Sequence, residues 1–292
     1  MGYMHIENLY KNQDIFMFKR CYAMEKIHGT SAHISYKDGN INFFAGGSKH
    51  ETFVKLFDVE MLLMALKETT SDERSIHIYG EAYGGSIQRG WTTESYGNQI
   101  CFVAFEVKIG DTWLSVPKAE HFCKRLGLDF VHYLEIPTML EYIDAERDAD
   151  SIQAIKNGMG EGHKREGIVL RPLEEVIKNN GERVIAKHKR ADCSETTTPR
   201  NITDKLIRQT DIKKIVDEWV TEERLNHIVT SGEVELKLEN IGKMMHIMIS
   251  DIYREGKDEI EESKDLERAI GRETALLVKR QIKNEFYISQ ER

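Results

Sequence analysis

The sequence predicts an α+β fold in two parts, a strand-rich region followed by a small all-helical region. Alternating segments at 32–36 and 41–44 flank Asp38-Gly39, a pair typical of a tight turn between two antiparallel strands. From residue 202 onwards apolar residues recur at helical spacing, without a strand pattern. We therefore expect two domains, 1–200 and 201–292, because the polar, proline-containing stretch before residue 202 resembles a boundary.

Other elements follow from the spacing of apolar residues and from turn signals. Helical spacing predicts single helices over 52–67 and 138–156 and another over 117–126, where Pro117 stands in the first turn and Gly127 follows the end. The glycine-rich stretch 158–162 does not fit the spacing of a dinucleotide-binding loop, so we interpret it as a flexible connection. Predicted strands are 15–23, 76–81, 100–107, 128–136, 165–172 and 183–190, and predicted C-terminal helices are 202–220, 234–253 and 259–288.

Composition narrows the class of protein. The 292 residues are 40% apolar and 31% charged, and no apolar run approaches the roughly 18 residues of a membrane span. No secretory signal pattern is found at the N-terminus. The four cysteines are scattered without a C-x-x-C pair, which indicates reduced thiols in a cytoplasmic protein. We expect no membrane partner.

The formal net charge of −8 argues against a protein that coats nucleic acid, because such a protein would be basic. It does not exclude an enzyme that binds nucleic acid in one cleft, since the local field there steers the ligand.

Two sets of lysines are candidates for chemistry. Lys26 precedes the predicted hairpin and Gly29 stands close to it, which suits a lysine nucleophile but also an ordinary surface lysine. Lys187 and Lys189 alternate along one strand and so share a face. Because two neighbouring cations repel each other, either solvent or an anion must compensate them.

Five stretches give these lysines a context by their order along the chain: 25–29 (EKIHG), 79–81 (YGE), 102–107 (FVAFEV), 166–171 (EGIVLR) and 187–189 (KHK). Their order and spacing resemble the covalent nucleotidyltransferase superfamily of ligases and mRNA capping enzymes, over about residues 1–195. The K-x-H-G-T form of the first stretch resembles the phage-type RNA ligase 2 and RNA-editing ligase family. The helical C-terminal region agrees with that family, whereas an OB-fold would be expected in DNA ligases and capping enzymes.

The resemblance implies a nucleotidyltransferase domain of antiparallel sheets with flanking helices. It implies an ATP-dependent RNA ligase that joins 3′-hydroxyl and 5′-phosphate ends through a lysyl-AMP intermediate, with Mg²⁺ or Mn²⁺ as cofactor. The partner would be RNA, best as a nicked duplex during RNA repair, and we expect the protein to be a monomer.

The same resemblance assigns roles to residues. Lys26 would be the nucleophile, Glu166 would hold the metal directly or through water, and Lys187 and Lys189 would neutralise the α-phosphate. Glu81 would accept from the ribose hydroxyls and Phe105 would stack on adenine, with Glu106 beside it. The complete ATP-binding set implied is Glu25, Lys26, Ile27, His28, Gly29, Glu81, Phe105, Glu106, Lys187 and Lys189. We also expect Glu166 to face solvent in a cleft, so that its loss affects activity more than stability.

Three positions depart from the family pattern. Ser31 stands where asparagine is usual, and Glu106 stands where aspartate is usual. The arginine expected after the hairpin is missing, and Lys49 would replace it only as a point charge without a bidentate fork. Ser31 and Lys49 are therefore tentative contacts for the RNA end.

Three other functions stay open. The chain could be another covalent nucleotidyltransferase, such as a DNA ligase or a capping guanylyltransferase. It could also be a non-catalytic relative that binds nucleic acid, or a scaffold whose C-terminal helices bind a protein partner.

Overall fold

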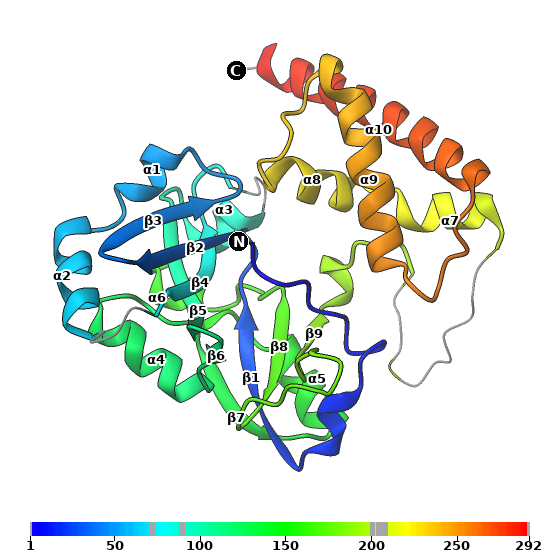
Figure 1. The fold of residues 1–292 in the computed structure, drawn as a ribbon. Helices are drawn as coiled ribbons and strands as arrows, with labels where there is room; N and C mark the ends of the chain where they lie inside the picture. The colour runs from blue at the N-terminus through cyan, green and yellow to red at the C-terminus, as the bar shows by residue number, and fades with distance from the viewer. Residues whose placement is uncertain (1, 70–73, 88–90, 199–201, 203–209, 291–292) are drawn as a thin grey trace. The chain divides into compact units, whose positions relative to one another are not determined.

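The computed structural model describes residues 2–69, 74–87, 91–198, 202 and 210–290 (Figure 1). The chain divides into two compact units, Met1–Arg190 and Ala191–Arg292. The boundary predicted from the sequence, at residue 200, lies outside the described residues.

Two antiparallel sheets form the centre of the first unit (Figure 1). Sheet A has the order β7-β1-β8-β9 and sheet B the order β3-β2-β4-β5-β6. Sheet A consists of β1 (Arg20–Lys26), β7 (Tyr133–Pro137), β8 (Gly167–Pro172) and β9 (Ala186–Lys189). Sheet B consists of β2 (Thr30–Lys37), β3 (Asn40–Ala45), β4 (Ile76–Tyr83), β5 (Cys101–Ile109) and β6 (Thr112–Trp113). With the helices around them, these sheets confirm the predicted α+β class and the antiparallel pairing.

The chain passes from one sheet to the other at Lys26. β1 ends at this residue in sheet A, and β2 begins at Thr30 in sheet B. The predicted hairpin of β2 and β3 is confirmed, with Asp38 and Gly39 in the turn at φ of 50° and 79°. The three connecting residues, 27–29, thus lie at the junction of the two sheets.

Short helices surround these sheets. They are η1 (Asp14–Met17), α1 (His50–Val54), α2 (Val59–Thr69), α3 (Trp91–Tyr96), α4 (Val116–Arg125), α5 (Leu140–Asp148) and α6 (Ile152–Lys156). One apolar core joins both sheets and several helices, for example through Met24 of β1, Ile78 of β4 and Phe122 of α4. Burial of this shared core holds the sheets together.

Two helices that the sequence predicts as continuous are divided. The segment 52–67 forms α1 and α2, because Asp58 accepts from the amide of Met61 at 3.0 Å and so caps a new helix. The segment 138–156 forms α5 and α6, because Ser151 accepts from the amide of Ala154 at 3.0 Å. Helical periodicity continues across both breaks and therefore conceals them.

The N-terminal segment pairs with the last strand of sheet A. The amide of Leu9 donates to the carbonyl of Lys187 at 2.8 Å, and the amide of Lys187 donates to the carbonyl of Glu7 at 2.9 Å. Leu9 is fully buried. This segment therefore satisfies backbone groups on the outer edge of β9.

The second unit is helical, as predicted, with its own core. It contains η2 (Ala191–Cys193), α7 (Ile212–Trp219), α8 (Glu222–Thr230), η3 (Leu238–Asn240), α9 (Ile241–Glu255) and α10 (Lys264–Gln290). The predicted helix over 202–220 is described only from α7 onwards, and residues 203–209 lie outside the described ranges. Helix α8 was not predicted from the sequence. Within the described residues, no helix is long and apolar enough to cross a membrane.

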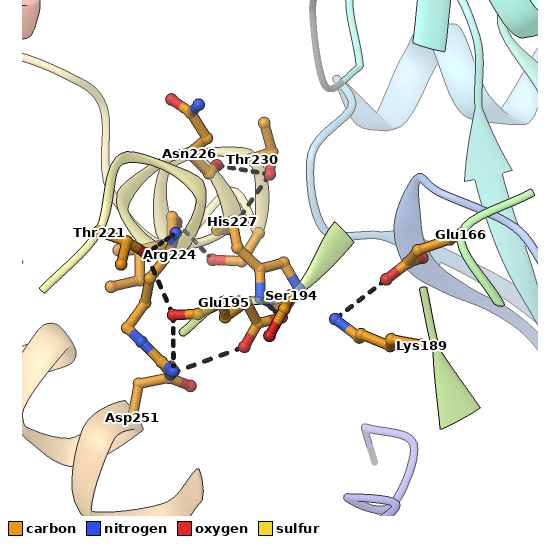
Figure 2. A network of polar contacts seen from close by, with 12 residues as sticks. Glu166, Lys189, Ser194, Glu195, Thr221, Arg224, Asn226, His227, Thr230 and Asp251 are labelled. Atoms are coloured by element: carbon orange, nitrogen blue, oxygen red, sulfur yellow. Dashed lines mark hydrogen bonds and ion pairs between the residues drawn. The ribbon is translucent and has the colours of Figure 1, made fainter. Parts of the chain in front are cut away.

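A buried arginine organises this unit. Arg224 of α8 pairs with Asp251 of α9, and its Nε donates to the carbonyl of Trp219 at 3.0 Å. Glu195, which precedes α7, lies 3.6 Å from the same guanidinium (Figure 2). These contacts tie α7, α8, α9 and the segment before α7 into one body.

Candidate active site

Lys26 and Glu166 meet at the end of β1. The register of β1 and β8 places Lys26 opposite Gly167, so Glu166 stands one residue before its strand partner. Lys26 Nζ lies 2.6 Å from Glu166 Oε2, and His28 Nδ1 lies 3.5 Å from the same oxygen. The side chains of Lys26 and His28 are each 24% exposed, so both groups are accessible to a ligand.

Lys189 reaches the other oxygen of Glu166. The register of β8 and β9 places Lys189 opposite Gly167, and Lys189 Nζ lies 3.0 Å from Glu166 Oε1 (Figure 2). Burial alone would raise the pKa of Glu166, but the ammonium groups of Lys189 and Lys26 and the hydrogen bond from His28 hold this pKa well below its usual value. Glu166 is therefore a carboxylate at neutral pH, shared between two lysines.

Glu166 is not solvent-facing, which corrects one expectation from the sequence. Its residue exposure is 3%, because β8, β9 and the two lysines surround it. Its loss should consequently leave buried positive charge without compensation and affect stability as well as activity.

The lysine pair on β9 is arranged as strand alternation predicts. Lys187 and Lys189 are two residues apart in β9, while His188 between them contacts Asp144 at 2.7 Å on the side of α5. For Lys189 an anion, Glu166, supplies the compensating charge. Lys187 is 8% exposed and its backbone pairs with the N-terminal segment.

Sheet B contributes Glu81 to the same place. Burial raises the pKa of Glu81 to about 8; the cations Lys26 and Lys189 oppose this rise, and the negative charge of Glu166 adds to it. Glu81 therefore lies within electrostatic range of the Lys26 centre although its strand belongs to the other sheet. A second carboxylate beside Glu166 is thus kept largely protonated at neutral pH until a cation approaches.

Gly29 allows sheet B to approach the junction. A Cβ on this residue would lie 2.3 Å from the carbonyl oxygen of Ala82 and 2.9 Å from Cγ of Glu81. Gly167 is similarly confined, since a Cβ there would lie 2.3 Å from the carbonyl of His188. Both glycines are needed for close packing of strands, whereas the sequence suggested that Gly29 leaves room for a ligand.

The side chains of Glu25 and Ile27 point away from this group of residues. Glu25 is 3% exposed and accepts from Ser151 Oγ at 2.5 Å, and Ile27 is buried in the core of the first unit. Alternation along the chain explains this, because neighbours of Lys26 face the opposite side. Both side chains are thus engaged within the protein, and the place of Glu25 and Ile27 in the ATP-binding set stays a prediction.

Glu106 also lies in a protein-filled environment. Its carboxylate is 2.8 Å from Arg171 Nη1, accepts from Arg183 Nη1 at 2.9 Å, and accepts from the Tyr3 hydroxyl. Burial would raise the pKa of Glu106, but Arg171 and Arg183 outweigh it and lower this pKa. Arg171, Arg183 and Tyr3 thus bind the carboxylate of Glu106, and its contact with a nucleotide stays a prediction.

Phe105 is the extra residue where β5 shifts register. Tyr79 pairs with Glu106 while Gly80 pairs with Ala104, which leaves Phe105 in a bulge. Its ring centroid lies 5.0 Å from that of Tyr3 in an edge arrangement. Phe105 is partly exposed.

The two tentative RNA-end residues lie near the start of β2. Ser31 is exposed and stands opposite Glu81 in the register of β2 and β4, so both side chains share one face. Lys49 is exposed at the end of the loop 46–49, which is tied to β2 by Gly46 donating to Ser31 at 3.1 Å and Gly47 donating to Thr30 Oγ1 at 3.1 Å.

Several buried polar residues around this site were not predicted from the sequence, namely Ser151, Gln153, Tyr83, Arg171 and Arg183. A local signal existed for Ser151, because Asp150-Ser151 is a typical helix start within the predicted helix 138–156. For the two arginines no local signal exists, since their partner Glu106 is more than sixty residues away in the sequence.

Comparison with known proteins agrees with this geometry. The model of the RNA ligase family matches residues 19–189, more than half of the chain. No curated protein matches the chain.

Solved structures of Naegleria gruberi RNA ligase have a similar fold. A ligand-free lysine-to-alanine variant matches with 19% identity and a TM-score of 0.50, covering 65% of this chain and 56% of that one. A lysine-to-methionine variant with AMP and Mn matches with 18% identity, the same TM-score and the same coverage. The chain thus spans little more than half the length of these structures.

Proposed function

The chain belongs to the RNA ligase family, and we propose that it is an ATP-dependent enzyme that joins RNA 3′-hydroxyl and 5′-phosphate ends through a Lys26-AMP intermediate. The observation that carries this proposal is the carboxylate of Glu166, held between Lys26 Nζ at 2.6 Å and Lys189 Nζ at 3.0 Å. A lysine nucleophile and a second cation for the phosphate are thereby fixed beside one another.

The first step would transfer AMP to the protein. Free lysine has a pKa of about 10.4, so the Lys26 ammonium must first release a proton to solvent. Lys26 Nζ then forms a bond to the α-phosphorus and releases a second proton to solvent, while the bond to the β-phosphate oxygen breaks and pyrophosphate leaves. Lys187 and Lys189 would neutralise negative charge on the α-phosphate as it develops.

The two later steps would join the RNA. The 5′-phosphate of RNA attacks the same phosphorus and displaces Lys26, which regains its amine. The 3′-hydroxyl then attacks the activated 5′-phosphate, AMP leaves, and a phosphodiester forms. We infer that Ser31 and Lys49 contact the RNA ends, because both are exposed. Ser31 stands opposite Glu81, and Lys49 ends the loop that is bonded to the start of β2.

The nucleotide would lie between the two sheets. Glu81 would accept from the ribose hydroxyls, and its place in the field of Lys26 and Lys189 supports this role. His28 would contribute from the loop that joins the sheets, where it already contacts Glu166. Phe105 remains our proposal for the residue that stacks on adenine, since it is partly exposed in β5.

Mg²⁺ or Mn²⁺ would fit beside Glu166 and Glu81. These ions bind through one or two carboxylates together with substrate phosphates, and the negative charge of Glu166 beside Glu81 favours an approaching cation. Such an ion would offset the charge of the ATP phosphates. The four cysteines are free, which agrees with a cytoplasmic protein.

Adenylation with α-labelled ATP and Mg²⁺ tests the proposal. The wild-type protein should acquire label through an acid-labile bond, Lys26→Ala should acquire none, and Lys37→Ala, an exposed lysine at the end of β2, should match the wild type. Absence of label on the folded wild-type protein overturns the proposal. Label from GTP instead of ATP would favour a capping guanylyltransferase.

Joining assays test the substrate. A nick with an RNA 3′-hydroxyl and a 5′-phosphate should be sealed faster than free single strands are joined. Faster joining of single strands contradicts the proposed nick specificity, and preference for a DNA nick would favour a DNA ligase.

A further inference from the structure

The start of helix α6 (Ile152–Lys156) is hydrogen-bonded to Glu25, the residue that precedes the nucleophile Lys26. The carboxylate of Glu25 accepts from Ser151 Oγ at 2.5 Å, from the amide of Ile152 at 3.1 Å and from the amide of Gln153 at 3.2 Å. Glu25 lies on β1 of sheet A, directly before Lys26. The first turn of α6 is thus fixed to the strand that carries Lys26.

The other end of α6 is fixed to sheet B. Gln153 Nε2 donates to the Tyr83 hydroxyl at 2.9 Å, and this hydroxyl donates to Asn157 Oδ1 at 3.3 Å. Tyr83 is the last residue of β4 and stands two residues after Glu81, so it shares a face with Glu81. The helix therefore connects the strand of Lys26 to the strand of Glu81.

A third contact joins α6 to α3. The side-chain Nδ2 of Asn157, the residue that ends α6, donates to the carbonyl of Tyr96 at 3.1 Å. Tyr96 is the last residue of α3, so this helix is attached to α6 as well.

These contacts are buried, which makes them rigid. Ser151 is fully buried, Glu25 and Gln153 are each 3% exposed, and Tyr83 and Tyr96 are each 2% exposed. A buried donor that loses its acceptor regains no hydrogen bond from water, so each contact resists displacement.

We propose that α6 is a positioning element that fixes the amine of Lys26 relative to Glu81, with Glu25 as the positioning residue for the nucleophile. Glu25 and Lys26 project to opposite faces of β1, so anchoring Glu25 to α6 fixes the direction of Lys26. This inference rests on the proposed function, because it concerns the rate of lysyl-AMP formation.

The test separates the attack of Lys26 from the rest of the reaction. Glu25→Gln keeps the shape of the side chain but turns one acceptor into a donor. At saturating ATP, lysyl-AMP formation should slow by about tenfold or more, with the KM for ATP changed less than about twofold. Joining of a synthetic pre-adenylated RNA, which bypasses Lys26, should stay within about twofold of the wild type.

Two matched variants calibrate this result. Lys26→Ala should abolish lysyl-AMP formation but retain joining of pre-adenylated RNA. Glu135→Gln, which breaks an exposed ion pair with Arg20 at the other end of β1, should match the wild type in both assays. If Glu25→Gln does not fold, Ser151→Ala decides, because it removes one contact and keeps the carboxylate.

The outcomes are distinct. If Glu25→Gln, or Ser151→Ala in its place, slows both assays equally, α6 only stabilises the fold. If lysyl-AMP forms at the wild-type rate, α6 does not position Lys26. In either case the proposed function stands. A folded wild-type protein that forms no lysyl-AMP overturns the proposed function and this inference together.

Discussion

Two buried carboxylates in the first unit have the same arrangement and different surroundings. Glu166 lies between two lysines and Glu106 lies between two arginines. The lysine side chains at Glu166 are 24% and 13% exposed, whereas the arginine side chains at Glu106 are 1% and 3% exposed. The lysines around Glu166 are therefore accessible to a ligand, whereas the arginines around Glu106 are not.

The choice of cation matches this difference. Arginine binds a carboxylate through a rigid fork and keeps its charge, which suits a permanent link between Arg171 of β8, Arg183 and Glu106 of β5. Lysine is a flexible point charge that can exchange one oxygen for another. A carboxylate between two cations is therefore a structural link when the cations are buried arginines that bind it through a rigid fork. It is a candidate site when the cations are partly exposed lysines.

The largest expected effect is on chemistry at Glu166. Glu166→Gln keeps the shape but removes the charge that holds Lys26 and Lys189, so lysyl-AMP formation should fall by about a hundredfold or more. Single-turnover labelling with ATP measures this rate, and circular dichroism confirms the fold. A loss of less than about threefold would show that Glu166 does not organise the nucleophile.

A smaller effect, on stability, is expected at Glu106. Glu106→Gln should lower the free energy of unfolding by about 3 kcal/mol, because two buried arginines lose a carboxylate while Glu175 still pairs with both. Urea denaturation measures this change. Glu135→Gln is the exposed control and should cost at most about 1 kcal/mol. Equal losses of unfolding free energy for Glu106→Gln and Glu135→Gln would show that the buried Glu106 centre contributes no more stability than the exposed pair of Arg20 and Glu135.

The smallest effect concerns pH. The pKa of Glu81 is raised from 4.5 to about 8, so the folded state binds this proton more tightly than the unfolded state. The stability that Glu81 contributes is therefore fully present below about pH 4.5 and is lost as the pH rises to about 8. Glu166 and Glu106, whose pKa values are lowered, have the opposite effect and lose stability as the pH falls below their usual range.

Urea denaturation at about pH 5 and pH 8 checks this sign. Glu81→Gln should reduce the decline in the free energy of unfolding between these two pH values by about 1 to 2 kcal/mol. The effect is this small because the half-buried carboxyl group keeps some contact with water. An unchanged decline would mean that another group causes it.

Local signals predicted the parts of the fold that depend on neighbouring residues. The hairpin follows from Asp38-Gly39, whose backbone geometry needs no distant contact. The shared face of Lys187 and Lys189 follows from alternation in β9, whereas the pairing of β9 with β8 supplies the anion, Glu166, beside Lys189. The helical second unit follows from periodicity, although α8 was not predicted, because this helix has only nine residues.

Contacts between distant segments account for the rest. The break at Ser151 has a local cap, but the attachment of α6 to Glu25, more than a hundred residues earlier, has no local signal. Glu106 was assigned to the nucleotide because the resemblance covers its position, but its arginine partners lie on other segments. A single sequence carries no local mark of which distant charge a carboxylate will meet.

The pairing of residues 7–9 with β9 has a consequence for solubility. An uncovered strand edge offers unpaired amides and carbonyls to another chain, and edge-to-edge association of sheets begins from such surfaces. Here Glu7 and Leu9 bond the backbone of Lys187 and cover this part of the outermost strand of sheet A. Removing the first nine residues would expose this edge, and the shortened protein should self-associate with rising concentration.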